Sequence, residues 1–152
     1  MSTEDRASAT VELTHHFQAS PEAVFDAWVE AETLARWFCG SKAQTAEAWT
    51  CAHPGGCYLV VMRGDGRDWP HAGHYTCVER PERLAFSWYT PSTDNQRSDV
   101  MLQLEEEAGG TRLALTHSRL PRELRGDFEA GWRELLAQLA TLLRDARPGT
   151  TP

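Results

Sequence analysis

The sequence lacks any long uninterrupted run of apolar residues. No stretch of about 18 such residues occurs, so no transmembrane helix is expected. The N-terminal segment, MSTEDRASAT, is polar and contains no apolar signal region. We therefore expect a protein of the cytoplasm that has no membrane partner.

Positive charge is also scarce. The 15 Lys and Arg residues are outnumbered by 22 Asp and Glu, which gives a formal net charge of −7 at pH 7. Nonspecific nucleic-acid binding requires a basic surface that displaces counterions, and anionic membrane surfaces attract polybasic segments. The charge balance therefore predicts no nucleic-acid partner and again no membrane partner.

Cysteine motifs of the common redox and metal types are missing. The four cysteines, Cys39, Cys51, Cys57 and Cys77, form no C-x-x-C pair, and in a cytoplasmic protein they are expected as free thiols. The segment Cys51-Ala-His53-Pro-Gly-Gly-Cys57 supplies zinc-type ligands, but its spacing matches no standard structural zinc site. We therefore predict no metal and no cofactor.

The chain does contain clear hydrophobic periodicities. Residues 9–17 alternate apolar and polar positions, which predicts a strand. Helical spacing follows over 21–29 and 31–38, with Ser20 as N-terminal cap and Gly40 as C-terminal cap. Further strands are predicted at 44–51, 57–63, 72–79, 84–90, 98–106 and 111–118, with turns between them that include 63–70.

The last periodic segment is a long amphipathic helix, PRELRGDFEAGWRELLAQLATLLRDA, with a continuous apolar stripe. A curved antiparallel sheet must bury one face, and this helix is the only predicted element large enough to cover it. The expected fold class is therefore α+β. We predict one domain over residues 9–145, with flexible tails at 1–8 and 146–152.

Several segments resemble a known family. They are FQASPEAVFDAWVEAETLARWF (17–38), GGCYLVVM (55–62), DG (65–66), AGHYTCVERPERLAFSW (72–88), GGTRLALTHSRLP (109–121) and the GW of FEAGWRELLAQL (128–139). In this order they resemble the activator-of-Hsp90-ATPase-homologue-like family of the START-like (SRPBCC, helix-grip) superfamily. The resemblance implies a helix-grip fold, in which a curved seven-stranded antiparallel sheet wraps around the C-terminal helix and leaves a hydrophobic cavity.

Aromatic side chains are the candidates for the wall of that cavity, since six Trp residues are many for 152 residues. Each of them could equally fill the core. The residues that we predict to bind a ligand are Trp37, Phe38, Tyr58, Tyr75, Trp88, His117, Phe128 and Trp132.

Acid–base chemistry inside the cavity would need a titratable side chain there. By strand position, the candidates are His15, Tyr75, Glu79 and His117, and Cys77 with His117 is a candidate nucleophile pair. The resemblance places Cys77 where family members often carry Glu, which weakens the catalytic interpretation. We assign no catalytic residue, and the residues favour a binding protein over an enzyme.

The predicted function is binding of a small hydrophobic or amphipathic molecule in the internal cavity. One alternative is a cyclase or hydrolase that acts in the same cavity, since the superfamily contains cyclases as well as binders of lipids, polyketides and hormones. The other is a co-chaperone-like or stress-response protein that binds a partner by its surface. Exposed sheet edges could also pair two copies into a homodimer.

Overall fold

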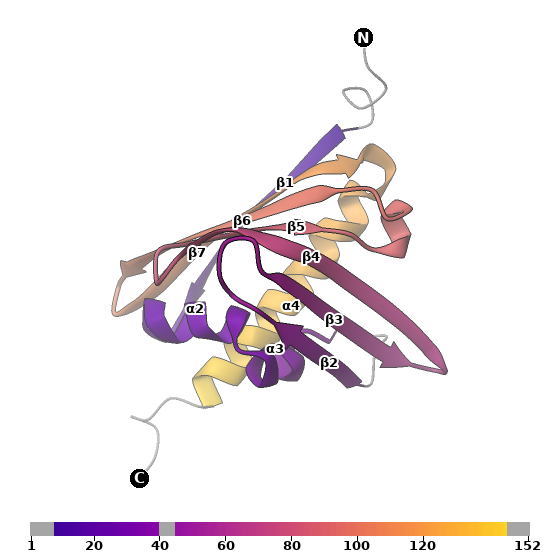
Figure 1. Ribbon diagram of the computed structural model, residues 1–152. Helices are drawn as coiled ribbons and strands as arrows, with labels where there is room; N and C mark the ends of the chain where they lie inside the picture. Colours follow the sequence, from indigo (N-terminus) through magenta and orange to yellow (C-terminus); the bar gives the residue numbers. More distant parts are fainter. Residues whose placement is uncertain (1–7, 40–44, 146–152) are drawn as a thin grey trace.

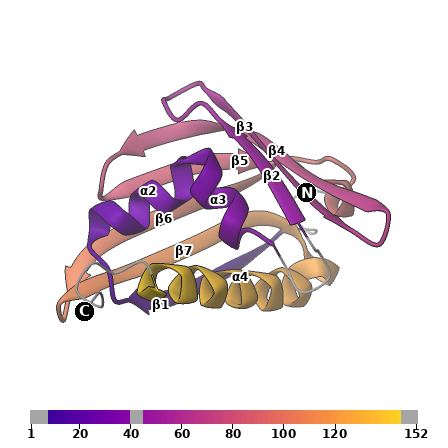
Figure 2. The same ribbon diagram turned by 90° about the horizontal axis from the view of Figure 1, so that it is seen from below.

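The computed structural model describes residues 8–39 and 45–145. Within them, seven antiparallel strands form one curved sheet, and the helices lie against one of its faces (Figure 1; Figure 2). The strand order is β1-β7-β6-β5-β4-β3-β2, so the first two strands of the chain form opposite edges. The elements are β1 (Ser8–Phe17), α2 (Pro21–Val29), α3 (Ala31–Trp37), β2 (Thr45–Thr50), β3 (Cys57–Gly64), β4 (Arg67–Glu79), β5 (Arg83–Trp88), η1 (Pro91–Thr93), β6 (Ser98–Glu107), β7 (Gly110–Pro121), η2 (Arg122–Leu124) and α4 (Arg125–Asp145).

The predicted fold class is confirmed: an α+β helix-grip arrangement with two short helices after the first strand and a long C-terminal helix. Figure 2 shows α4 running along the concave side of the sheet, with α2 and α3 beside it on the same face. The cap predicted at Gly40 lies outside the described residues. So do the predicted tails, apart from Ser8, which begins β1.

The connection between β3 and β4 is shorter than the turn expected at 63–70. Only Asp65 and Gly66 lie between the two strands, and both have positive φ angles, of 53° and 73°. A two-residue hairpin turn of this kind matches the twist of its flanking strands. Pro70 falls inside β4, where it pairs with Val61 of β3. Paired residues of β4 and β5 begin only beyond it, and a proline is tolerated where a strand has a neighbour on one side.

Local backbone and side-chain features define the ends of the two short helices, α2 and α3. The Ser20 hydroxyl accepts a hydrogen bond from the Ala23 amide at 3.1 Å, which confirms the predicted N-terminal cap of α2. One extended residue, Glu30, separates α2 from α3 and changes the direction of the chain between them. The turn brings the Trp28 and Trp37 rings to a centroid distance of 4.7 Å, in an edge-to-face arrangement.

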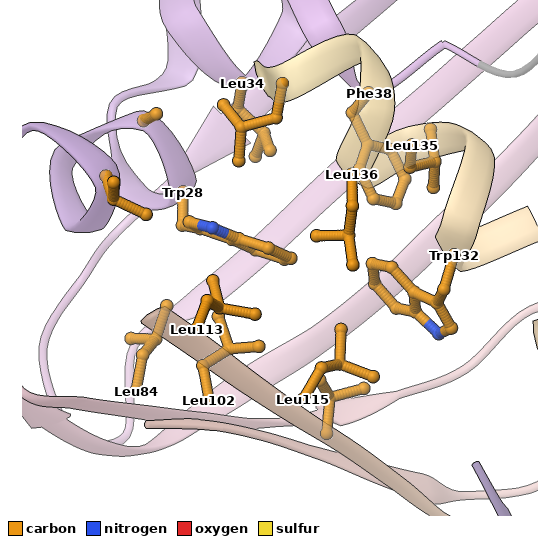
Figure 3. Packing of buried hydrophobic residues seen from close by; sticks show 14 of the residues in the cluster. Trp28, Leu34, Phe38, Leu84, Leu102, Leu113, Leu115, Trp132, Leu135 and Leu136 are labelled. Carbon is orange, nitrogen blue, oxygen red and sulfur yellow. The ribbon is translucent and has the colours of Figure 1, made fainter. Parts of the chain in front are cut away.

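The hydrophobic core lies between α4 and the sheet. Figure 3 shows Trp28 of α2 pointing toward Leu136 and Trp132 of α4, above leucines that rise from the sheet. These side chains are buried, and Leu136 is only 1% exposed. The leucines that face the helices from β5, β6 and β7 are Leu84, Leu102, Leu113 and Leu115.

A close backbone approach inside the sheet gives one testable prediction. A Cβ atom at Gly73 would overlap the Ser87 carbonyl oxygen and lie 2.9 Å from a ring carbon of Tyr58. We expect Gly73→Ala to lower the free energy of unfolding by about 2–3 kcal/mol, because the backbone must shift. Urea unfolding tests this, with Gly126→Ala as control, since no atom lies within 4 Å of a Cβ there. Equal stability of Gly73→Ala and the wild type would contradict the assigned packing.

Candidate functional site

A cavity of about 360 Å³ opens between α4, α3 and one end of the sheet. This volume is at the small end of the range for ligand pockets, roughly 300–1,000 Å³. Side chains from β3, β4, β5, η1 and α4 form its wall. The lining residues are Phe38, Met62, Trp69, His71, Trp88, Thr90, Pro91, Ser92, Asp127, Phe128, Gly131, Trp132, Glu134 and Leu135.

Aromatic rings make up much of this wall. The Trp88 ring, at the end of β5, lies with its centroid 5.3 Å from that of Trp132 and 5.7 Å from that of Phe38. Phe128 stands one helical turn before Trp132 on α4 and lines the same cavity. Such rings offer large, rigid apolar surface to a ligand.

Two buried nitrogen atoms belong to lining residues. Neither His71 Nδ1 nor Trp88 Nε1 has a hydrogen-bond partner among the described residues. Burial lowers the pKa of His71 to about 4, an effect that the nearby Val60 and Trp69 backbone partly offsets. His71 is therefore uncharged at neutral pH. Unpartnered buried groups call for an explanation, and a ligand is one.

A chain of hydrogen bonds holds the Trp132 indole in place. Its Nε1–H donates to His117 Nδ1 at 3.0 Å, so Nδ1 carries no proton. The proton of the neutral imidazole is therefore on Nε2, which donates to the Ser98 hydroxyl at 2.8 Å, and that hydroxyl donates to the Trp88 carbonyl at 3.3 Å. Burial lowers the pKa of His117 to about 3, which keeps this tautomer uncharged.

A second, much smaller cavity of about 20 Å³ lies among the aromatic rings of the core. A space of this size holds about one water molecule. The Tyr58 hydroxyl beside it donates to the Ser87 carbonyl at 2.6 Å. The lining residues are Trp28, Leu34, Phe38, Tyr58, Val60, Tyr75, Phe86 and Trp88.

The predicted ligand-binding residues divide into three groups. Phe38, Trp88, Phe128 and Trp132 line the larger cavity. Tyr58 and Tyr75 line only the smaller one. Trp37 and His117 line neither: the Trp37 indole donates to the Ala27 carbonyl at 2.8 Å, and His117 lies behind Trp132.

Sequence reasoning missed several lining residues, above all Trp69 and His71. Trp69 was assigned to the turn at 63–70, and His71 fell between that turn and the strand predicted at 72–79, whereas β4 begins at Arg67. The Asp65-Gly66 dipeptide is a recognised two-residue hairpin signal. In a strand that begins at Arg67, the alternating direction of successive side chains would then have placed Trp69 and His71 on the same face.

Among the described residues, the Cys and His side chains that were considered as metal ligands or as a nucleophile pair form neither a metal site nor that pair. Cys51 Sγ lies 3.3 Å from His53 Nε2, but no three His, Cys, Asp or Glu side chains in the described ranges are grouped as metal ligands. Cys77 lines neither cavity. No helix within residues 8–39 and 45–145 is long and apolar enough to cross a membrane.

A curved antiparallel sheet that grips a long C-terminal helix, with a cavity between them, defines a START-like, helix-grip protein. The family model described as Activator of Hsp90 ATPase homolog 1-like protein matches residues 18–144. The chain therefore belongs to this family, whose fold is known for binding ligands in a cavity. No curated protein matches the sequence.

Solved structures of bacterial proteins share the fold. A Chromobacterium violaceum protein is 22% identical with a TM-score of 0.81, and the match covers 88% of this chain and 96% of that one. A Rhodobacter sphaeroides protein is 27% identical with a TM-score of 0.79, covering 90% and 93%. A Rhizobium leguminosarum protein is 23% identical with a TM-score of 0.75, covering 91% and 95%.

Proposed function

We propose that this protein binds a small hydrophobic or amphipathic molecule in the larger cavity. The observation that carries the proposal is the 360 Å³ cavity itself, which five aromatic side chains help to line: Phe38, Trp69, Trp88, Phe128 and Trp132. Moving an apolar ligand from water to such a wall is favourable because apolar surface is removed from water.

The unpartnered nitrogens then fix the orientation of the ligand. An indole N–H is only a donor, so the ligand atom that meets Trp88 Nε1 is an oxygen or another acceptor. A buried polar group left without a partner costs about 1–3 kcal/mol, and a ligand that pairs with it recovers part of this. Because both nitrogens are shielded from solvent, a small side-chain shift accompanies the contact.

Ligand binding is expected to raise the melting temperature. At a free concentration of 100 times its dissociation constant, a ligand adds about 2.7 kcal/mol to the stability of the fold. For a domain of this size that corresponds to an increase of about 5–11 °C. A thermal-shift screen of lipophilic compounds, with N-phenyl-1-naphthylamine as fluorescent reporter, makes the measurement.

Two glycines of α4 provide a matched pair of variants that locates the binding site. Gly131 lines the cavity, whereas Gly126 lies outside it on the same helix. No atom lies within 4 Å of a Cβ at either position, so both accept a larger side chain. We expect Gly131→Leu to weaken binding of the reporter at least tenfold and Gly126→Leu to leave it unchanged. Equal binding by both variants would contradict the proposed site.

A further inference from the structure

We infer that Cys51, His53 and Cys57 form a site of reversible oxidation, at which a peroxide converts the two thiols into a disulfide. The three residues lie around the connection between β2 and β3, and they line neither cavity. The inference is therefore independent of the proposed ligand binding. In this site Cys51 attacks the peroxide, His53 takes the thiol proton, and Cys57 closes the disulfide.

The two cysteines lie opposite each other at the end of a pair of strands. β2 and β3 are antiparallel, and their last ladder pair is Thr50 with Tyr58. The next pair along is Cys51 with Cys57, and the Cys51 amide donates to the Cys57 carbonyl at 3.0 Å. Opposite residues joined in this way have Cα atoms about 5.5 Å apart. Disulfides span Cα distances of about 4.4–6.8 Å, so the backbone spacing suits a bridge.

Both cysteine side chains point to the face of the sheet that lies away from the helices. Side chains alternate along a strand, and the adjacent residues Ala52 and Tyr58 pack in or against the core. Cys51 and Cys57 are both exposed and both free thiols. Opposite Cβ atoms on one face are about 4.5–5.5 Å apart, so an approach of about 1 Å closes the bridge. Cys51 follows the end of an edge strand, so this movement disturbs no second neighbouring strand.

The Cys51 thiol has a proton acceptor beside it. His53 Nε2 lies 3.3 Å from Cys51 Sγ, and His53 Nδ1 lies 3.2 Å from the Pro54 carbonyl oxygen. A carbonyl oxygen only accepts, so Nδ1 carries the proton and donates to it. In the neutral imidazole, Nε2 is then unprotonated and accepts from the thiol. A nucleophile, a base and a group that orients the base are thus arranged in one short segment.

The oxidation balances in two steps. In the first, Cys51 Sγ attacks one oxygen of hydrogen peroxide while its proton passes to His53 Nε2. The O–O bond breaks, and the leaving hydroxide takes that proton and departs as water, which leaves a sulfenic acid on Cys51. In the second, the Cys57 thiol attacks Cys51 Sγ, the S–O bond breaks, and the hydroxyl leaves as water with the Cys57 proton. Two thiols are oxidised to one disulfide, and one peroxide is reduced to two waters.

The other two cysteines are in less reactive surroundings. Cys39 and Cys77 are only partly exposed, and Cys77 lies opposite Ala85 of β5 rather than opposite a thiol. Burial raises the pKa of both thiols, which lowers the fraction present as the nucleophilic thiolate. We therefore expect oxidation at Cys51 before either of them.

Thiol counting and peptide mapping test the inference. In the wild type, hydrogen peroxide should reduce the number of thiols that react with Ellman's reagent from the four of the sequence by two, and dithiothreitol should restore them. Mapping should find Cys51 linked to Cys57 within one chain. The double variant Cys39→Ser, Cys77→Ser should form the same link. The same chains in concentrated urea should react at least about tenfold more slowly, because the contact between thiol and base is lost.

Three variants separate the roles of the residues. Cys57→Ser should stop at a sulfenic acid on Cys51, which dimedone labels. Cys51→Ser should form no disulfide within the chain. His53→Ala, at an exposed position, should slow the first step at least about tenfold at pH 7. The matched control is His16→Ala, which lies on the opposite edge strand and should leave the rate unchanged.

The results that would overturn the inference are equally specific. A disulfide that joins two chains or involves Cys39 or Cys77 would show that the pair is not the preferred site. A folded protein that reacts no faster than the chain in urea would show that the thiol is not activated. The same rate in His53→Ala as in the wild type would remove the base on which the site depends.

Discussion

Replacing Trp132 by alanine is expected to lower the free energy of unfolding by about 3–5 kcal/mol. The side chain is only 2% exposed, and its ring lies 5.9 Å from that of Trp28 and 5.3 Å from that of Trp88, centroid to centroid. The substitution removes this packing. It also leaves His117 Nδ1, which accepts from the indole, without its partner.

Urea unfolding followed by circular dichroism measures the loss. Trp132→Phe serves as the matched variant, because it keeps an aromatic ring but removes the N–H donor; we expect it to lose about 1–2 kcal/mol. A loss well below 1 kcal/mol for Trp132→Ala, together with altered ligand binding, would show that the side chain belongs to the cavity wall and contributes little to the core.

Much of the fold was predictable because its signals are local. The alternation in 9–17, the capped start of α2 and the apolar stripe of α4 each depend on residues close in the chain, and each was observed. The β3–β4 hairpin was the main error. The turn predicted at 63–70 included Pro70, whereas a strand that is paired on one side tolerates a proline.

The wall of the cavity was harder to predict, because side-chain direction depends on register and on where a helix ends. Trp37 and Phe38 are adjacent and were both expected to line a cavity. Trp37 is the last residue of α3, and its indole turns inward to the Ala27 carbonyl. Phe38 follows the helix and lines both cavities.

The contribution of the polar face of α4 to the cavity wall could not be predicted from the sequence. The amphipathic pattern of α4 treats Asp127 and Glu134 as members of its polar face. Only the position of the helix against the end of the sheet brings them to the same opening as Trp88 and His71. Sequence-distant residues meet there because the β3–β4 hairpin and the end of β5 approach one side of α4 (Figure 2).

Mild acid is expected to destabilise the fold through its two buried histidines. In an unfolded chain the histidine pKa is about 6.5, whereas burial lowers it to about 3 for His117 and about 4 for His71. Between these values the unfolded chain binds more protons than the folded protein, so stability falls as the pH is lowered from about 6.5. At pH 4.5 each histidine accounts for a loss of about 2–3 kcal/mol, and the two together for about 5 kcal/mol.

The loss attributable to His117 can be measured by comparing stability at pH 7 and pH 4.5 in the wild type and in His117→Gln. A glutamine amide does not titrate, yet it can accept from Trp132 and donate to Ser98 as the imidazole does. The pH-dependent loss should therefore shrink by about 2–3 kcal/mol in His117→Gln. Carboxylates that titrate in the same range contribute equally to both proteins and cancel in the comparison.

Acid destabilises the fold at His117 because of the hydrogen-bond donor and acceptor roles of its neighbours. Protonation would place an N–H on Nδ1 opposite the Trp132 indole, which is itself only a donor. Two donors would then face each other in a buried position, and the helix that carries Trp132 would lose its hydrogen bond to β7. The same pH dependence in His117→Gln as in the wild type would show that His117 is not the group that titrates.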